Sequence, residues 1–334
     1  MKERILWLDC LKGFAILLVV LGHCIHTMAG PGETLWGGVL YLIYCFHMPL
    51  FFAASGYLYG PRGERFRQSP QGMGGYILSR ALALGIPGAV FGLVQGILSF
   101  TRQTQGSLGQ RLLSAGMEGV AAYWFLPVLM ALSALLPLLD ALLRREGAVA
   151  GLLLFSSLLA GIWHNGAGVF LFYGFCFYGG ALLERHPKAL EGGPLPVVLA
   201  ASLFLAGAAV SFFERDGALI TDLYLKALLG VPGAYACLWL FRRRKLLTRW
   251  KFLARMGRDT LAVYLLHGFC YEGVWVLLGL AGWEIPWLGV PLGTAAGILL
   301  PMGARALAGK NKLLDFLFSP GPILKKYMCK GGKG

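Results

Sequence analysis

Residues 7–23 of the chain read WLDCLKGFAILLVVLGH, and this stretch decides the fold. A helix that crosses a membrane needs about 20 mostly apolar residues, and the surrounding range 5–28 supplies them. Three ionisable residues, Asp9, Lys12 and His23, nevertheless lie inside the stretch. At about 100° per residue, Lys12 and His23 point in nearly the same direction, and Asp9 lies within about 40° of that line. The stretch therefore predicts a membrane-spanning helix with one polar face.

The polar face of this first helix points to chemistry. Ionisable groups inside a bilayer are costly unless they are partnered, so they indicate a functional site by default. His23 lies roughly 16 Å beyond Lys12 along the helix axis. The alternative is a histidine that packs and hydrogen-bonds to a neighbouring helix. Three ionisable groups on one face favour function, and they also argue against a removable signal peptide, whose apolar region is short and uncharged.

The composition predicts an all-α, polytopic membrane protein. Of 334 residues, 57% are hydrophobic and only 14% are charged, whereas about a quarter of the residues of a soluble domain are charged. We interpret residues 1–310 as one membrane domain and residues 311–334 as a basic cytoplasmic tail. About ten spanning helices are expected, near 5–28, 36–59, 76–100, 123–142, 148–163, 166–184, 195–213, 220–241, 259–281 and 285–307.

The positive charges predict the orientation. Lys and Arg gather in alternate connections, for example around Arg62, Arg144 and Arg185 and in the run from Arg242 to Arg258. Because cytoplasmic loops are enriched in Lys and Arg, both termini are expected to be cytoplasmic. The formal charge of +14 is thereby assigned to an anionic bilayer surface. Nucleic acid is excluded as a partner, since no aromatic-studded basic groove accompanies the charges.

Polar residues recur in three further segments. In the second helix His47 precedes Pro49, and Ser55-Gly56 would let another helix approach closely. His47 is expected to line the same cavity as His23 or to serve the proline kink. Tyr264 and His267 share one face of the ninth segment, with functional and structural interpretations equally open. The seven cysteines show no metal-type spacing, so no metal site is expected.

Arg80 opens the third helix and has two interpretations. It is either an arginine that extends to the cytoplasmic interface or a fixed cation for a phosphorylated ligand that enters from inside.

At these residues the sequence resembles the acyltransferase-3 family of membrane-embedded acyltransferases. The first motif is Asp9-x-x-Lys12-Gly13 with Gly22-His23, and the second runs from Phe46-His47-Met48-Pro49 to Ser55-Gly56-Tyr57. The aromatic entry Trp124-Phe125-Leu126 and the late Thr260-Leu261 with Tyr264-Leu265-Leu266-His267 complete the pattern. The second motif is most similar to the fucose 4-O-acetylase-like sugar acetylases.

The resemblance implies transfer of an acyl group, usually acetyl from acetyl-CoA, to a hydroxyl of a sugar, glycan or glycolipid. His23 matches the essential histidine and Lys12 its basic partner. Arg80 matches the first arginine of an Arg-x-x-Arg pair whose second position is Ala83. The pair is therefore broken, so either another base must substitute or the affinity for the donor falls. The donor is a substrate, so no bound cofactor is expected. A bacterial inner membrane is the implied location, and a homo-oligomer is one alternative for the assembly.

We hypothesise that His23 deprotonates the acceptor hydroxyl or itself carries the acyl group. Asp9 would neutralise Lys12 until the donor arrives, and Lys12 and Arg80 would hold the donor phosphates. His47, Ser55, Trp124, Tyr264 and His267 complete the expected acyl-CoA and substrate site. The rival classes are a proton-coupled transporter or flippase of a polar substrate and a scaffold that has lost catalysis.

Overall fold

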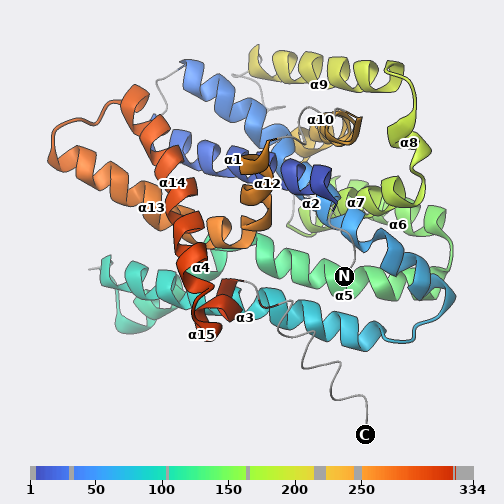
Figure 1. Ribbon diagram of the computed structural model, residues 1–334, viewed down its shortest axis with the longest axis horizontal. Coiled ribbons are helices and arrows are strands. Elements are labelled where there is room, and N and C mark those ends of the chain that lie inside the picture. The colour runs from blue at the N-terminus through green and yellow to red at the C-terminus, as the bar shows by residue number, and fades with distance from the viewer. Residues whose placement is uncertain are drawn as a thin grey trace, which may run out of the picture.

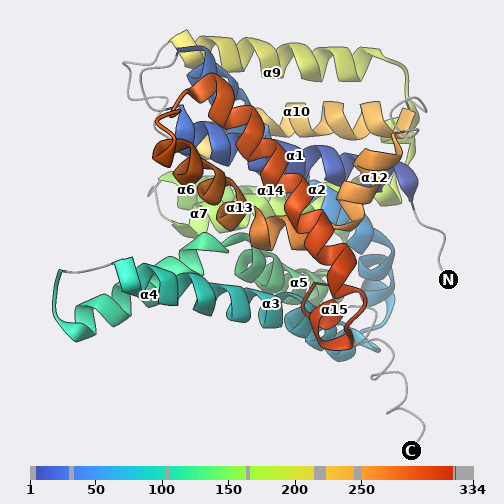
Figure 2. The same cartoon turned by 60° about the vertical axis from the view of Figure 1, so that its left-hand side comes forward.

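The computed structural model describes residues 5–29, 34–102, 105–162, 166–213, 223–243, 250–318 and 320. Every secondary-structure element in this part of the chain is a helix. In Figure 2 most of the long helices run roughly parallel in stacked layers, and α14 crosses them obliquely. The helices are α1 (Leu6–Met28), α2 (Thr34–Gln68), α3 (Met73–Arg102), α4 (Leu108–Ala122), α5 (Phe125–Leu143), α6 (Glu146–Ile162), α7 (Gly166–Arg185), α8 (Lys188–Glu191), α9 (Leu195–Phe213), α10 (Leu223–Arg243), α12 (Lys251–Arg258), α13 (Thr260–Leu280), α14 (Pro286–Ala308) and α15 (Lys312–Phe318).

The helices confirm an all-α, polytopic membrane protein. A helix occupies each of the ten ranges that the sequence predicts. Among the described residues, seven helices are long and apolar enough to cross a membrane, and two shorter apolar helices cover Glu146–Leu159 and Leu195–Val210. The connection between the fifth and sixth predicted helices, residues 163–165, lies outside the described residues.

Four helices were not predicted: the single turn α8, which has four residues, and three longer helices that each depart from the pattern of a membrane span. α4 has 15 residues and is amphipathic, α12 has eight with basic residues at its end, and α15 has seven. Such segments are too short or too charged to span a bilayer as a single apolar run. α15 lies in the predicted tail, but it packs against α14 and α3, where Phe318 meets Phe91 with ring centroids 5.8 Å apart.

Helix α1 is the central helix of the fold and contacts α2, α10, α12, α13 and α14 (Figure 1). Its tightest neighbour is α12. A Cβ added to Gly13 would collide with the carbonyl of Leu253, and one added to Gly257 would collide with the carbonyl of Asp9. Because glycine has no side chain, the two backbones touch. This contact places the short basic helix α12 beside the polar face of α1.

Helices α2 and α7 make a second close contact, as predicted for Ser55-Gly56. A Cβ on Gly56 would collide with the carbonyl of Phe177, and one on Gly180 would collide with that of Ala53. Small residues at such crossings let membrane helices pack closely. The pair holds His47 and Ser55 of α2 against the centre of the bundle.

A buried polar cluster joins α2, α5 and α7 at one end of the bundle. Asp140 is fully buried and accepts hydrogen bonds from the hydroxyls of Tyr59 at 2.6 Å and Tyr178 at 2.7 Å. Nη2 of Arg185 lies 3.2 Å from Oδ2 of Asp140. Arg67 extends the cluster by pairing with Glu146 at 3.1 Å. Because each charge has a partner, the cluster can be buried without an isolated ion.

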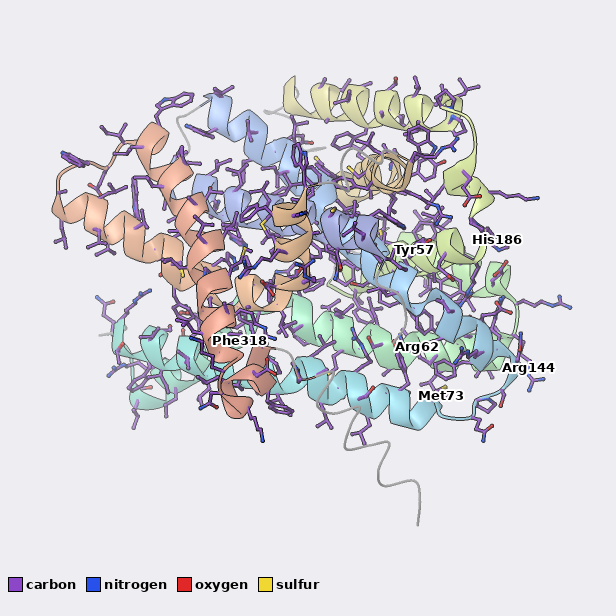
Figure 3. All side chains as sticks on the ribbon, viewed as in Figure 1. Tyr57, Arg62, Met73, Arg144, His186 and Phe318 are labelled. Carbon is purple, nitrogen blue, oxygen red and sulfur yellow. The ribbon has the colours of Figure 1, made fainter. Side chains whose placement is uncertain are left out.

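The connections predicted to be cytoplasmic gather at this same end. Figure 3 labels Arg62, Met73, Arg144 and His186 from four different helix ends, and all lie on one side of the molecule. Arg242, at the end of α10, hydrogen-bonds to Tyr57 and lies 6.0 Å from the ring centroid of Trp7 at the start of α1. The alternation of helix directions is therefore as predicted. Which compartment this end faces stays a prediction.

Candidate active site

A cavity of about 720 Å³ lies in the middle of the bundle. Its walls come from α1, α2, α7, α13, the α4–α5 junction, the end of α12 and Leu84 of α3. Small-molecule sites in proteins usually have volumes of about 300–1,000 Å³. Most of the predicted site residues line this cavity, namely Lys12, His23, His47, Ser55, Trp124, Tyr264 and His267.

Histidine side chains from three helices meet at one end of the cavity. The rings of His23 and His267 have centroids 5.2 Å apart. The ring of Tyr271 stacks on that of His23 at 6.5 Å and lies 6.0 Å from that of His267. His47 lines the same cavity from α2. The first, second and ninth predicted helices thus bring their histidines together.

Backbone carbonyls orient two of these imidazoles. Nδ1 of His47 lies 2.7 Å from the carbonyl oxygen of Ile43, and Nδ1 of His267 lies 2.8 Å from that of Tyr264. A carbonyl oxygen only accepts hydrogen bonds, so Nδ1 of each ring carries the proton. In the neutral ring Nε2 is then left as the acceptor and proton-binding atom.

His23 is accessible within the cavity. Its neighbours Gly22 and Cys24 are buried in the packing of α1, whereas the His23 side chain is exposed and lines the cavity. A ring in that position can meet a bound molecule directly. Of the three imidazoles, it is the one whose surface the bundle leaves most open.

Cationic side chains lie at the opposite end of the cavity. Lys12 and Arg258 both line it. The glycine contact between α1 and α12 brings them there, because Gly13 follows Lys12 and Gly257 precedes Arg258. Nζ of Lys12 lies 3.3 Å from Oδ1 of Asp9. Asp9 therefore acts on the cavity through Lys12, since it does not line the wall itself.

Two expectations from the sequence are changed by these positions. Arg80 lies outside the cavity wall, one helical turn before Leu84, which does line it. Arg258, by contrast, was counted only among the basic residues of a cytoplasmic loop. In the sequence, Arg258 is a cationic residue two positions before Thr260. Its place at the cavity follows from the packing of α12 on α1, which the sequence does not reveal.

Aromatic side chains form most of the remaining wall. Trp124 and Tyr173 have ring centroids 5.7 Å apart, and so do Phe125 and Tyr264. Tyr44 lies 5.2 Å from His47 between ring centroids. Tyr44 and Tyr173 are further wall residues that the sequence did not single out. These aromatic side chains line a mostly apolar passage, with the cationic side chains at one end and the imidazoles at the other.

The described ranges of the chain contain no candidate metal site. Within them, no group of three or more His, Cys, Asp or Glu side chains is arranged to hold a metal ion.

Comparisons with known proteins agree with the pattern of the helices. A model of the acyltransferase-3 family, described as an acyltransferase domain, matches residues 5–305. Nodulation protein NolL of Mesorhizobium japonicum is 35% identical over 129 residues, which is 37% of this chain and 33% of that protein. The match thus spans about a third of the length of that relative. No solved structure matches the chain.

Proposed function

Because the chain belongs to the acyltransferase-3 family, we propose that it is a membrane O-acyltransferase that moves an acyl group from acyl-CoA to a hydroxyl of a sugar, glycan or glycolipid. One observation carries the proposal. A single cavity joins a cationic end, with Lys12 and Arg258, to an imidazole end, with His23 and His267. A donor with phosphates at one end and a thioester at the other matches this arrangement.

The cationic end would bind the phosphates of the donor. A guanidinium can grip phosphate oxygens through two parallel hydrogen bonds, and an ammonium adds a point charge. Ala83 occupies the position of the second arginine in the family's usual pair, and Arg258 would supply the missing positive charge. Before the donor arrives, Asp9 neutralises Lys12 across their 3.3 Å contact.

The imidazole end would carry out the transfer. The acceptor hydroxyl gives its proton to a ring nitrogen of His23 while its oxygen attacks the thioester carbonyl carbon. The new carbon–oxygen bond forms, the carbon–sulfur bond breaks, and the proton passes from His23 to the departing thiolate. The hydroxyls of Ser55 and Tyr44 line the same cavity and are the donors available to the oxyanion.

The test is acetyl-CoA turnover by the purified protein in nanodiscs, followed as free thiol and as label transferred from radiolabelled acetyl-CoA to a panel of sugars. His23→Ala should lower the rate by about 10²- to 10⁴-fold, the usual contribution of a general base. His26→Ala is the matched control, because His26 lies one turn further along α1 and does not line the cavity. Its rate should stay near that of the unaltered protein.

Near-normal turnover in His23→Ala would overturn the assignment of the base. Transport of a polar solute without any acyl-CoA dependence would instead support the transporter class.

A further inference from the structure

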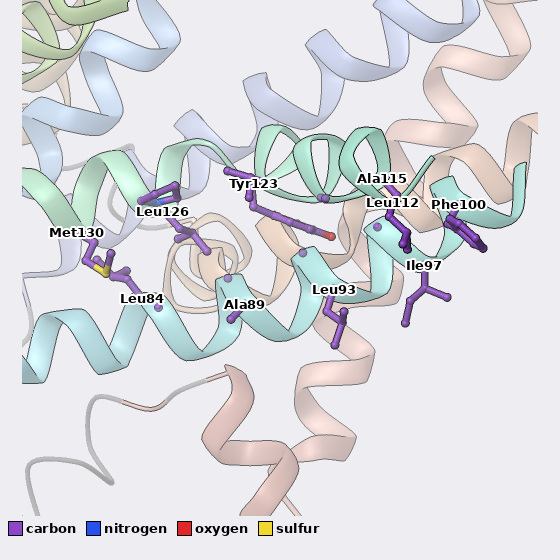
Figure 4. A pocket seen from close by; sticks show the side chains of 18 residues that line it. Leu84, Ala89, Leu93, Ile97, Phe100, Leu112, Ala115, Tyr123, Leu126 and Met130 are labelled. Carbon is purple, nitrogen blue, oxygen red and sulfur yellow. The ribbon is translucent and has the colours of Figure 1, made fainter. Parts of the chain in front are cut away.

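A second cavity, of about 540 Å³, lies between α3, α4 and the start of α5 (Figure 4). Almost every side chain that lines it is apolar, including Leu93, Ile97 and Leu112. We call it the α3–α4 groove. Along α3 its lining runs from Leu84 to Phe100, which corresponds to roughly 24 Å of helix. The hydrocarbon core of a bilayer is about 30 Å thick, so the groove follows most of that depth.

Glycines of two kinds build the groove. Gly92 and Gly119 bring the helices together, because a Cβ on Gly119 would collide with the carbonyl of Gly92. Gly88 and Gly116 instead leave open space. A Cβ on Gly116 would meet nothing within 4 Å, and one on Gly88 would come only to 3.4 Å from Cδ1 of Leu126. Gly92 and Gly119 thus allow close packing of α3 on α4, whereas Gly88 and Gly116 leave the space that forms the groove.

The groove shares a wall with the cavity of about 720 Å³ that holds His23, which we call the active-site cavity. Leu84 and Leu126 line both spaces. The end of α4 divides them, since Gly119, Val120 and Tyr123 face the groove while Ala121, Ala122 and Trp124 face the active-site cavity. Tyr123 secures this wall by donating a hydrogen bond to the carbonyl oxygen of Leu265 at 3.0 Å.

We propose that the α3–α4 groove binds the hydrocarbon chain of a lipid-linked acceptor, whose sugar then reaches His23 beyond the shared wall. This inference rests on the proposed function and narrows its acceptor to a glycolipid. A free sugar would find almost no polar partner in the groove, whereas a hydrocarbon chain needs none.

The position of the groove favours the acceptor over an acyl chain of the donor. α3 and α4 are peripheral, and the side of α4 that faces away from the groove exposes Leu113 and Met117. A lipid can therefore enter sideways from the bilayer. The donor phosphates would bind at Lys12 and Arg258, which line the active-site cavity and not the groove, whereas a lipid-linked acceptor has to approach from the bilayer. The groove lies between peripheral helices and shares Leu84 and Leu126 with the active-site cavity, as a glycolipid requires.

The test uses a defined probe, dodecyl glucoside with a photoreactive diazirine in its chain, on the full-length protein in phosphatidylcholine nanodiscs. Gly116→Leu fills the open part of the groove. Gly109→Leu is the matched control, because Gly109 lies two turns earlier on α4, has open space around it and does not line the groove. A second pair is Ile97→Trp, which lines the groove, and Val94→Trp, which is also exposed on α3 but does not.

In the unaltered protein and both controls, the probe should label peptides of α3 and α4. Excess dodecyl glucoside should remove the label, and methyl glucoside should not. Gly116→Leu and Ile97→Trp should lower labelling at least about fivefold. Both variants should also lose acetyl transfer to dodecyl glucoside in the same proportion, while they keep transfer to methyl glucoside.

Equal labelling in the groove variants and their controls would overturn the inference, because the probe would then report ordinary contact with the bilayer. Free-thiol release from acetyl-CoA is measured on the same samples with His23→Ala beside them. If unaltered protein lacks His23-dependent release, the proposed function fails, whatever the labelling shows. If release is intact but the labelling does not respond to Gly116→Leu or Ile97→Trp, only the acceptor groove fails.

Discussion

At the residue scale, Arg258 is the position where the structure changes the expected chemistry most. It lines the active-site cavity beside Lys12, whereas Arg80, the arginine that the family pattern favours, lies outside the wall. Ala83 stands where the family pattern has its second arginine, and α12 offers a cationic side chain from a different part of the chain. The cationic end of the cavity is thus assembled from α1 and α12.

Arg258→Gln should raise KM for acyl-CoA about ten- to a hundredfold with a smaller change in kcat. A hydrogen bond to a charged group contributes about 1.5–3 kcal/mol, and about 1.4 kcal/mol corresponds to tenfold in affinity. Steady-state kinetics with acetyl-CoA checks this. Arg255→Gln is the control, because Arg255 lies on the same helix, pairs with Asp259 at 3.9 Å and does not line the cavity. An unchanged KM in Arg258→Gln would remove it from the donor site.

The contact between His23 and His267 leads to a second prediction. Their ring centroids are 5.2 Å apart, so the two imidazoles should act as one unit. His267→Asn should lower kcat at least tenfold, because the substitution removes the ring that packs against His23 and orients its imidazole. The double variant His23→Ala with His267→Asn should be no slower than His23→Ala alone, since effects within a catalytic unit are not additive. Additive losses in a kinetic double-variant cycle would show that the two rings act separately.

At the element scale, short and glycine-containing segments position the site. α12 has only eight residues, yet its backbone contact with α1 brings Arg258 to the cavity. The break between α4 and α5 separates the active-site cavity from the α3–α4 groove. Neither α12 nor the break between α4 and α5 is a long apolar run, so the hydropathy of the sequence predicts neither of them.

Gly257→Ala tests the α1–α12 contact. Its Cβ would collide with the carbonyl of Asp9, so α12 must shift. Overpacking of this kind usually costs about 1–3 kcal/mol. We expect a lower midpoint of thermal unfolding together with a raised KM for acyl-CoA. Gly273→Ala on α13, where a Cβ meets nothing within 4 Å, should change neither quantity. A normal KM in Gly257→Ala would mean that Arg258 does not depend on this contact.

At the scale of the whole molecule, the buried Asp140 cluster holds one end of the bundle together. Asp140→Ala would leave Arg185, of which only 5% of the side chain is exposed, without its buried partner. Breaking a buried ion pair on one side typically costs about 3–5 kcal/mol. We expect a clear drop in the midpoint of thermal unfolding in detergent. Glu64→Gln is the contrast, because Glu64 is 43% exposed, and surface pairs are worth about 0–1 kcal/mol. Equal effects of the two substitutions would contradict a structural role for the cluster.

The orientation of the molecule in the membrane gives a further prediction. Arg144 lies at the end predicted to be cytoplasmic, and Trp283 lies in the connection between α13 and α14. Trp283→Cys should react with a membrane-impermeant maleimide in intact cells, whereas Arg144→Cys should react only after the membrane is permeabilised. Both positions are exposed. The reverse pattern would place the charged end outside and overturn the predicted topology.

The range of each long helix was predictable, because the length and apolarity of a run are local properties of the sequence. The polar face of α1 was predictable for the same reason, since helical periodicity alone aligns Lys12 with His23. The long α2 was predicted only in part. It continues to Gln68, beyond the apolar run, because its last turns bury Phe66 and pair Arg67 with Glu146 at 3.1 Å.

The sequence by itself therefore determined a helical membrane protein, the polar face of its first helix and the family to which it belongs. Only the tertiary structure decided that Arg258 lies at the cavity and Arg80 does not, and that a groove lies behind the wall at Tyr123. The physical reason is that these features depend on how closely two helices approach. That distance is set by pairs of glycines far apart in the chain, such as Gly13 with Gly257 and Gly92 with Gly119, and no local pattern reveals which glycines will meet.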